Sequence, residues 1–280
     1  TTDLNTWANL YRLKMATALA EYYNYIFFEQ MDPRVKGWFL MDSPIPIILL
    51  VTSYVAFVKR VGPWWMRGRS AYNVEKVMLL YNMVQMTINA YFVVVALYYV
   101  WIPGHYSWVC QRPIYGPNPT EDKVVHYFYV FMCSRLLDLL DTVFMVLKKN
   151  KHQVSFLHLY HHVMMAVATW LCVKYMPGGH VAFFGTINAF VHVVMYFYYF
   201  LTSYDVSYKK SIWWKRHITE IQLIQFIVLV AQQGYAIISP SCDYPKYLLI
   251  FFLIQAVLMI YLFSDFYLKA YVMKNKAKKT

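Results

Sequence analysis

Charged side chains are scarce in this chain of 280 residues. Asp, Glu, Lys and Arg make up 14% of it, whereas 60% of the residues are hydrophobic and 20% are aromatic. An average soluble domain carries about 25% charged residues, so the composition excludes an ordinary water-soluble core. Several stretches of about 18 or more apolar residues are long enough to cross a bilayer as helices. The sequence therefore predicts an all-α polytopic membrane protein.

The apolar stretches predict seven transmembrane helices. Their ranges are 43–58, 77–102, 126–147, 154–176, 180–204, 218–238 and 247–267. Residues 1–42 carry charges throughout, which excludes a span or the apolar core of a signal peptide there. We expect a surface helix near residues 4–28 instead.

Lysine and arginine are distributed unequally over the two sides of this topology. Most of the 26 Lys and Arg residues fall in the loops after the odd-numbered spans and in the C-terminal tail. Cytoplasmic loops hold an excess of these residues. We therefore expect a lumenal N-terminal segment (1–42), a seven-helix catalytic domain (43–270) and a basic cytosolic tail (271–280).

The net charge of +12 arises mainly in these loops. Topology and attraction to anionic lipid account for such a basic face, so the bilayer is an expected partner. Nucleic acid is not expected, because no basic stripe lies on a soluble domain.

Cysteine is also rare, with four residues. Cys110 and Cys242 fall in loops on the predicted lumenal side, where a disulfide can form. The alternative is two free loop thiols. Cys133 and Cys172 lie within predicted spans, where cysteine commonly serves as a small apolar core residue.

Polar residues within four predicted spans repeat at intervals of three or four, which puts them on one face of each helix. Ionisable groups in a membrane span are costly and are functional-site candidates. The direction of each span puts all four faces in the cytosolic half. The residues are Arg135, Asp138, Asp141 and Thr142, then His158, His161 and His162, then Asn188, His192, Tyr196 and Tyr199, and finally Thr219, Gln222 and Gln225.

Single members of this set have structural explanations. Gln222 or Thr219 alone would suit an interhelical hydrogen bond, and Arg135 with Asp138 could be a structural ion pair. Three histidines facing two carboxylates predict a catalytic site. The expected catalytic residues are His158, His161, His162, His192, Asp138 and Asp141, and the other members of the set are expected to bind substrate.

The pattern His158-x-x-His161-His162 allows two kinds of chemistry. Membrane di-iron desaturases and hydroxylases bind metal through several such histidine boxes. This chain has one box, and its other histidines apart from His192 lie singly at loops and span ends, so no metal site is expected. The second chemistry is nucleophilic or acid–base work by imidazole. Asp138 or Asp141 would then accept a proton from one ring nitrogen and fix the tautomer.

Four ordered motifs resemble those of the ELO family of very-long-chain fatty acid elongases. They are Arg135-Leu-Leu-Asp138-Leu-Leu-Asp141-Thr142, His158-Leu-Tyr-His161-His162, His192-Val-Val-Met-Tyr196-Phe-Tyr-Tyr199 and Thr219-Glu-Ile-Gln222-Leu-Ile-Gln225. The likeness extends to Met41-Asp-Ser-Pro-Ile-Pro and to the lysine-rich segment 148–153. Arg135 and Asp138 stand where the family usually has Lys and Glu, which leaves open which of Asp138 and Asp141 touches a histidine.

The resemblance implies an endoplasmic reticulum enzyme that condenses a long-chain acyl-CoA with malonyl-CoA, releasing CO2 and CoA and forming a 3-ketoacyl-CoA. Malonyl-CoA is the co-substrate, and no metal or other cofactor is expected. The expected partners are the other enzymes of the elongation cycle, and extended apolar outer faces would allow a homodimer. A carrier or receptor with seven spans is the non-enzymatic alternative.

In the expected mechanism, His161 or His192 takes the acyl group as an acyl-imidazole. A single-step reaction with histidine only as a base is the rival. The acyl chain would occupy a tunnel enclosed by the inner bundle, and basic side chains would surround the CoA mouth. These are Lys148, Lys149, Lys151, Lys209 and Lys210, with Lys215 and Arg216 nearby. Lys276 and Lys278 resemble a dilysine retrieval signal.

Overall fold

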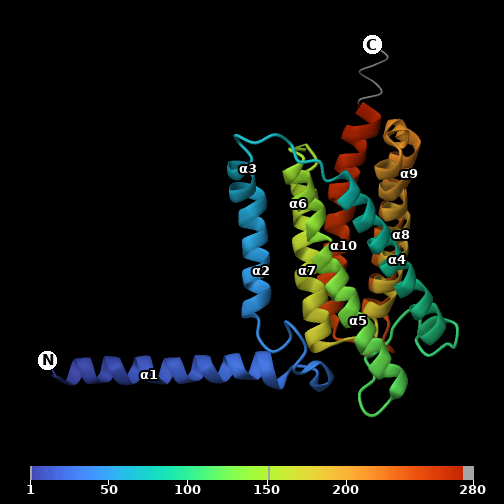
Figure 1. Cartoon of the computed structure of the whole chain (residues 1–280). Helices are drawn as coiled ribbons and strands as arrows, with labels where there is room; N and C mark the ends of the chain where they lie inside the picture. Colours follow the sequence, from blue (N-terminus) through green and yellow to red (C-terminus); the bar gives the residue numbers. More distant parts are fainter. Residues whose placement is uncertain (1, 151, 274–280) are drawn as a thin grey trace.

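The computed structural model describes residues 2–150 and 152–273, which form a bundle of helices joined by loops (Figure 1). These residues contain no β-strand. The main helices are α1 (Thr2–Asn24), α2 (Ile45–Ala56), α3 (Gly62–Trp65), α4 (Glu75–Ala96), α5 (Pro119–Leu137), α6 (Leu139–Leu147), α7 (Phe156–Tyr175), α8 (Val181–Tyr204), α9 (Ile212–Ile238) and α10 (Lys246–Tyr267). The all-α prediction is confirmed.

Short π-helical or 3-10 segments extend or connect these helices. They are η1 (Tyr25–Glu29), η2 (Pro33–Val35), η3 (Phe57–Val61), η4 (Leu97–Trp101), η5 (Val206–Lys210) and η6 (Leu268–Met273). Four of them, η1, η3, η4 and η6, are π-helical turns that continue a longer α-helix.

Six helices in the described part of the chain are long and apolar enough to cross a membrane. They cover Ile45–Trp65, Glu75–Trp101, Phe156–Tyr175, Val181–Tyr204, Ile212–Ile238 and Lys246–Met273. Each corresponds to one predicted span, with α9 beginning six residues earlier than the predicted 218. These six helices indicate a multi-pass membrane protein.

The predicted span 126–147 is instead two helices, α5 and α6, which meet at Asp138. The amide of Asp141 bonds to the carbonyl of Asp138 at 3.2 Å, a tighter three-residue turn at the junction. Neither half is an uninterrupted apolar helix of span length, so this segment is not among the six.

Local sequence signals explain where the central helices begin. Asn118 accepts hydrogen bonds from the amides of Thr120 and Glu121, at 3.0 and 3.4 Å, and Pro119 occupies the first turn of α5. The Ser155 hydroxyl caps α7 by accepting the amide of His158 at 3.1 Å. The cap of α7 therefore fixes the turn that carries the first histidine of the motif.

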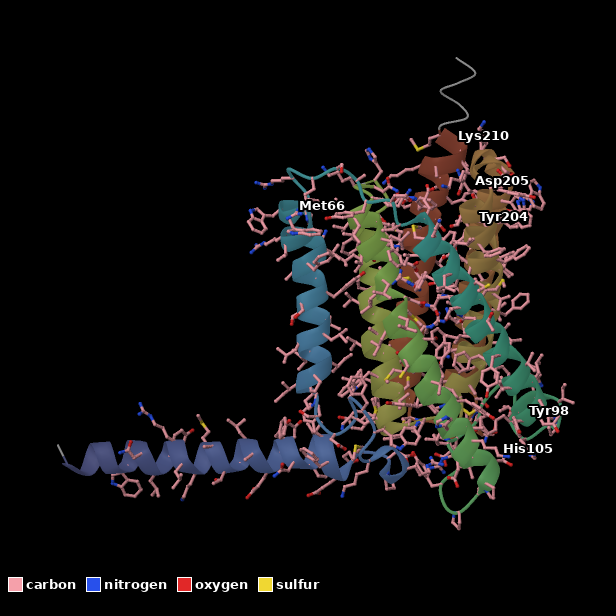
Figure 2. All side chains as sticks on the ribbon, in the orientation of Figure 1. Met66, Tyr98, His105, Tyr204, Asp205 and Lys210 are labelled. Carbon is pink, nitrogen blue, oxygen red and sulfur yellow. A yellow bond between two sulfur atoms is a disulfide. The ribbon has the colours of Figure 1, made fainter. Side chains whose placement is uncertain are left out.

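The two ends of the bundle differ in character. Figure 2 shows Lys210 and Met66 at one end and Tyr98 and His105 at the other. We call these the basic end and the disulfide end, because Cys110 and Cys242 form a disulfide beyond α4 and α9. Helix α1 lies at the disulfide end, roughly perpendicular to the bundle (Figure 1).

The disulfide ties the loop before α5 to the loop between α9 and α10. Its cysteines are 132 residues apart in sequence, with Cα atoms 5.6 Å apart. Around it, Arg112 pairs with Asp243. The Lys246 ammonium donates to the carbonyls of Ala236 and Ile237 at the end of α9 and of Ser239 just after it. The bridge thus anchors a region that is also held by charged contacts.

Breaking this bridge is expected to destabilise the protein. Cys110→Ser should lower the free energy of unfolding by roughly 2–4 kcal/mol, because it releases a long closed loop in the unfolded chain. The measurement is the thermal midpoint in detergent, with Cys133→Ser as the control for loss of a free thiol. A midpoint for Cys110→Ser equal to that of the control would contradict this stabilising role.

Candidate active site

Arg135 lies at the centre of a buried polar cluster formed by α4, α5 and α8. Its guanidinium donates from Nη1 to Nδ1 of His192 at 2.6 Å and to Oδ1 of Asn188 at 3.3 Å. Nη1 also lies 3.0 Å from Oδ2 of Asp138, and Nη2 donates to Oδ1 of Asn89. Arg135 is almost fully buried, so its charge is neutralised within the bundle rather than by water.

The contact with Arg135 determines the tautomer of His192. A guanidinium has five N–H donors and no acceptor. Nδ1 of His192 must therefore accept this bond through its lone pair, and the neutral ring carries its proton on Nε2. Nε2–H of His192 is thus a hydrogen-bond donor, fixed in place by a partner that does not lose its own proton.

Asp138 and Asp141 are joined by the hydroxyl of Tyr196. That hydroxyl lies 2.9 Å from Oδ1 of Asp138 and 2.7 Å from Oδ2 of Asp141. Gln85 donates to the same oxygen of Asp138. Tyr81 donates to the carbonyl of Leu137 at 3.1 Å, next to the break between α5 and α6. Tyrosine and amide donors therefore surround the carboxylates.

We expected a carboxylate to accept a proton from a histidine ring, and this expectation is wrong. Nδ1 of His192 lies 3.7 Å from Oδ2 of Asp138, too far for a hydrogen bond. The physical reason is that Arg135, one turn before Asp138 on α5, reaches both groups and lies between them. Asp138 is linked to His192 through Arg135, and Tyr196 joins Asp138 to Asp141.

The three histidines of α7 are held differently from one another. Nε2 of His158 is 2.8 Å from the Thr142 hydroxyl, which in turn is 2.6 Å from the Tyr54 hydroxyl of α2. The rings of His158 and His162 have centroids 4.2 Å apart. Within the described residues, no side-chain hydrogen bond reaches the ring of His161. His161 is half-buried, so its ring nitrogens are free to contact a ligand.

Helix α4 supplies residues that we did not predict. Tyr81, Asn82, Gln85 and Asn89 follow helical spacing on the face that packs against α8. Asn89 and Gln85 are fully buried and bind Arg135 and Asp138, and Asn82 donates to the Ser203 hydroxyl at 3.1 Å. Polar residues in 81–89 repeat at the same intervals of three or four that identified the polar faces of the other helices, so the polar face of α4 could have been predicted from the sequence.

The predicted residues of α9 do not join the hydrogen bonds of this cluster in the described part of the chain. Thr219 donates to the carbonyl of Lys215 at 3.0 Å, one turn back on its own helix. Gln222 makes a weak contact of 3.9 Å with the sulfur of Met195, and Oε1 of the buried Gln225 has no partner. Tyr199, by contrast, packs edge-on against Tyr196 with centroids 5.9 Å apart.

The predicted basic residues gather at the basic end. Lys148 lies 3.7 Å from Glu75, and Lys149, Lys209 and Lys210 are exposed. The Lys215 ammonium donates to the carbonyl of Lys209 at 2.6 Å, and Arg216 donates to Glu220 at 2.8 Å. Lys151, Lys276 and Lys278 lie outside the described residues, as does most of the predicted tail.

A largely apolar cavity of about 710 Å³ begins beside the cluster and extends toward the disulfide end. We call it the main cavity. It is lined by α5, α7, α8, α9 and α10. Phe131, whose ring lies 4.8 Å below the Arg135 guanidinium, and Met164, one turn after His161, lie at its start. Cys172 and Gln233 line it nearer the disulfide end.

The arrangement offers several groups for chemistry at one place. Nε2–H of His192 is a fixed donor, no side-chain hydrogen bond within the described residues holds the ring of His161, and the main cavity, which starts at Phe131 and Met164, can hold a long apolar group. Among the described residues, no three His, Cys, Asp or Glu side chains are grouped as metal ligands. The imidazoles of this cluster can act as nucleophile, base or hydrogen-bond donor.

Comparisons with known proteins cover the helices that carry this cluster. A model described as the GNS1/SUR4 family, ELO, matches residues 39–279. A very long chain fatty acid elongase of Aedes aegypti is 37% identical over 240 residues, covering 86% of this chain and 67% of that protein. Very long chain fatty acid elongase 7 of Rattus norvegicus is 36% identical over 251 residues, 89% of each chain. Very long chain fatty acid elongase 4 of Homo sapiens is 36% identical over 247 residues, 88% of this chain and 78% of that protein.

Proposed function

Because this chain belongs to the ELO family (GNS1/SUR4), we propose that it is a very-long-chain fatty acid elongase that condenses a long-chain acyl-CoA with malonyl-CoA. The products are a 3-ketoacyl-CoA, CO2 and CoA. The observation that carries this assignment is the ring of His161, which no side-chain hydrogen bond holds within the described residues and which lies one turn before Met164 at the start of the main cavity. Nε2–H of His192 in the same cluster is a donor.

His161 is the nucleophile of the first half-reaction. A free ring nitrogen attacks the thioester carbonyl, the bond between carbon and sulfur breaks, and CoA leaves as its thiol with the proton that the other ring nitrogen of His161 gives up. The acyl group is then held as an acyl-imidazole. His192 is less suited to this role, because Arg135 occupies the lone pair of Nδ1 and Nε2 carries the proton.

The second half-reaction forms the new carbon–carbon bond. Malonyl-CoA loses CO2, and the electron pair of the broken bond forms an enolate. That enolate attacks the acyl carbonyl, the bond to the His161 nitrogen breaks, and the ring takes one proton from water to return to neutral imidazole. Nε2–H of His192 is available to donate to an oxygen as negative charge develops on it.

The buried contacts of the cluster give it rigidity. Arg135 orients His192, and Asn89, Asn188 and Asp138 hold Arg135. Thr142 orients His158, and Tyr196 links the two carboxylates. Preorganised donors of this kind need little rearrangement during the reaction, which is where much of the catalytic advantage of such sites arises.

The main cavity is the acyl tunnel, and the α5–α6 pair is the seventh transmembrane segment. The basic end faces the cytosol of an endoplasmic reticulum membrane, and the tail is cytosolic. Lys148, Lys149, Lys209 and Lys210 lie at the basic end, and together with Lys151 they bind the phosphates of CoA. Thr219, Gln222 and Gln225 contact the substrate rather than the polar cluster. The other enzymes of the elongation cycle are the partners that consume the product.

The test uses purified protein with malonyl-CoA and a labelled long-chain acyl-CoA. The expected result is a labelled 3-ketoacyl-CoA two carbons longer, detected by mass spectrometry, with one CO2 released for each product. Absence of this product across saturated and unsaturated chains of several lengths, with protein that retains its thermal transition, would refute the assignment.

A further inference from the structure

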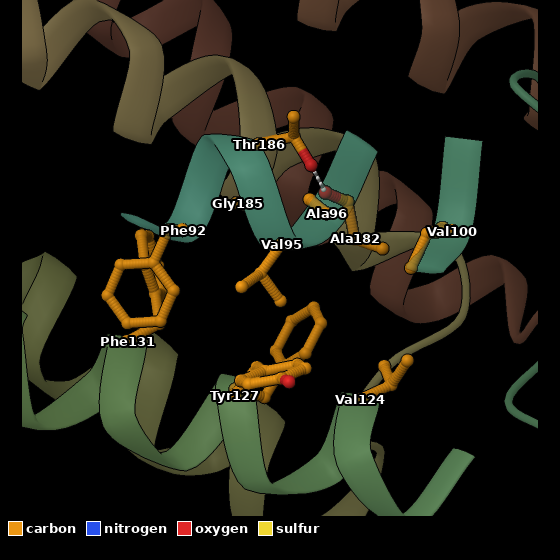
Figure 3. Close-up of a pocket in the computed structure, with 11 residues that line it drawn as sticks. Phe92, Val95, Ala96, Val100, Val124, Tyr127, Phe131, Ala182, Gly185 and Thr186 are labelled. Atoms are coloured by element: carbon orange, nitrogen blue, oxygen red, sulfur yellow. Dashed lines mark hydrogen bonds between the residues drawn. The ribbon is translucent and has the colours of Figure 1, made fainter. Parts of the chain in front are cut away.

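A second apolar cavity, of about 450 Å³, lies next to the main cavity in the half of the bundle nearer the disulfide end. We call it the side chamber. It is lined by residues of 92–100 on α4 and η4, of 124–131 on α5 and of 182–186 on α8. Figure 3 shows Val95 and Tyr127 pointing into it from opposite sides, with Phe92 and Phe131 at one end.

Two phenylalanines of α5, Phe128 and Phe131, line both cavities and form the partition between them. Phe131 is fixed in place, because it packs edge-on against Phe92 with centroids 5.4 Å apart and lies under the Arg135 guanidinium. Phe128 is only half-buried. The tip of its ring points to Gly185 of α8, where a Cβ atom would lie 4.0 Å from Cζ.

Gly185 leaves the space that the Phe128 ring needs to close the gap between α5 and α8. Rotation of that ring would join the side chamber to the main cavity without moving a helix. Aromatic rings in a partly packed position can change rotamer, whereas a ring packed on several sides cannot do so cheaply. Phe128 packs against two groups of buried residues, one around Val125 and Trp170 and one around Val124 and Ala182, but it is half-buried whereas Phe131 is buried, and its ring tip meets no side chain at Gly185. It is therefore the more movable ring of the partition.

The chemistry of the side chamber favours an alkyl group as its occupant. Its lining is apolar apart from Thr186 and Tyr127. The Thr186 hydroxyl already donates to the carbonyl of Ala182 at 2.8 Å and accepts from the Trp101 indole at 3.0 Å. The space of about 450 Å³ includes the open mouth of the side chamber, which is therefore a partly open apolar recess and not a sealed void. A hydrocarbon segment is the kind of group that such an apolar lining takes out of a polar environment.

We propose that the side chamber is a branch of the acyl-binding site, which takes the methyl end of chains longer than the main cavity holds when the Phe128 ring swings aside. This inference rests on the proposed elongase function. Phe128 is then a residue that determines specificity for chain length.

The arrangement of helices gives this proposal a direct readout. Residues of α4 and η4 line the side chamber and none lines the main cavity, whereas α7, α9 and α10 line the main cavity and not the side chamber. A reactive group at the methyl end of a bound chain would therefore label different helices, depending on which space it occupies.

The first experiment compares condensation rates over a series of acyl-CoA lengths for three variants. Phe128→Ala should shift the longest chain that is condensed upward by at least one two-carbon step. Adding Gly185→Leu to Phe128→Ala should fill the vacated space and reverse that shift. Phe190→Ala, an equal truncation on the exposed face of α8, should leave the length profile unchanged. An unchanged profile in an active Phe128→Ala protein would refute the proposal, as would a double variant that keeps the longer profile.

The second experiment uses an acyl-CoA with a diazirine at its methyl end. Long chains in Phe128→Ala should label the peptide that contains residues 92–100, and short chains should label α7, α9 or α10. Labelling of α7, α9 or α10 at all lengths would overturn the proposal. The proposal would also be overturned if the side chamber held a bilayer lipid instead of the acyl chain. In that case a lipid would co-purify with Phe128→Ala and not with the double variant, and product lengths would be unchanged. If the unaltered protein condenses no acyl-CoA, the proposed function fails, whereas condensation with an unshifted length profile rejects the side branch alone.

Discussion

His161→Ala is expected to lower the rate of condensation by roughly 10³-fold or more, a loss on the scale of removing a group that acts in the reaction itself. The ring of His161 is half-buried one turn before Met164, which lines the main cavity, and no side-chain hydrogen bond within the described residues holds it. Its removal should therefore disturb the fold little. The measurement is the initial rate of 3-ketoacyl-CoA formation, together with the thermal midpoint.

A trapping experiment separates the two-step reaction from a single-step one. Without malonyl-CoA, the unaltered protein should gain the mass of one acyl group on the peptide 156–175, and His161→Ala should not. The matched control is His152→Ala, which removes an exposed loop histidine and should retain both activity and adduct. A full rate in His161→Ala would exclude an acyl-imidazole at this residue. An acyl adduct on another residue would identify that residue as the nucleophile.

Arg135→Met is expected to impair both stability and activity. Arg135 and Asp138 are almost fully buried and lie 3.0 Å apart. Removing one member of such a pair leaves an uncompensated buried charge and costs about 3–5 kcal/mol. His192 would also lose the donor that fixes its tautomer. The thermal midpoint and the condensation rate should both fall.

Two further variants divide these effects. Arg135→Lys keeps the charge but loses the planar fork, so it should retain much of the stability and part of the rate. Combining Arg135→Met with Asp138→Asn removes both charges and should recover stability without recovering the rate. If the combined variant regained its activity, Arg135 would have no part in orienting His192, and an unchanged midpoint in Arg135→Met alone would show that the pair does not stabilise the fold.

Composition and periodicity predicted the helical membrane fold and the positions of six apolar spans, because burial in lipid imposes a long apolar run on each helix. The break at Asp138 could not be foreseen. Neither glycine nor proline occurs in residues 134–142, so the usual signals of an interrupted helix are missing. The interruption comes instead from tertiary contacts around a buried carboxylate.

Helical spacing identified the faces of the polar cluster but not the pairs within them. Spacing places Asp138 and His192 on inward faces, yet the rotation of α5 against α8 decides that Arg135 reaches His192 first. The α4 amides were missed because Gln85 and Asn89 carry no charge, and our search began with ionisable groups. The α9 side chains were assigned to the cluster only from their predicted level in the membrane. That level does not determine how a helix is rotated about its own axis, and so does not determine which side chains face the cluster.

The disulfide between Cys110 and Cys242 closes a covalent ring that contains α5, α7 and α8, which carry Arg135 and the histidines of the cluster. Helices α5 to α9 all lie between the two cysteines, whereas α2, α4 and α10 lie outside them. A protease that cuts once in the loop between α8 and α9 would therefore not release a fragment. The nicked protein should run as a single species on a gel without reductant and as two pieces with it, so a sample can be cleaved yet still contain every part of the cluster.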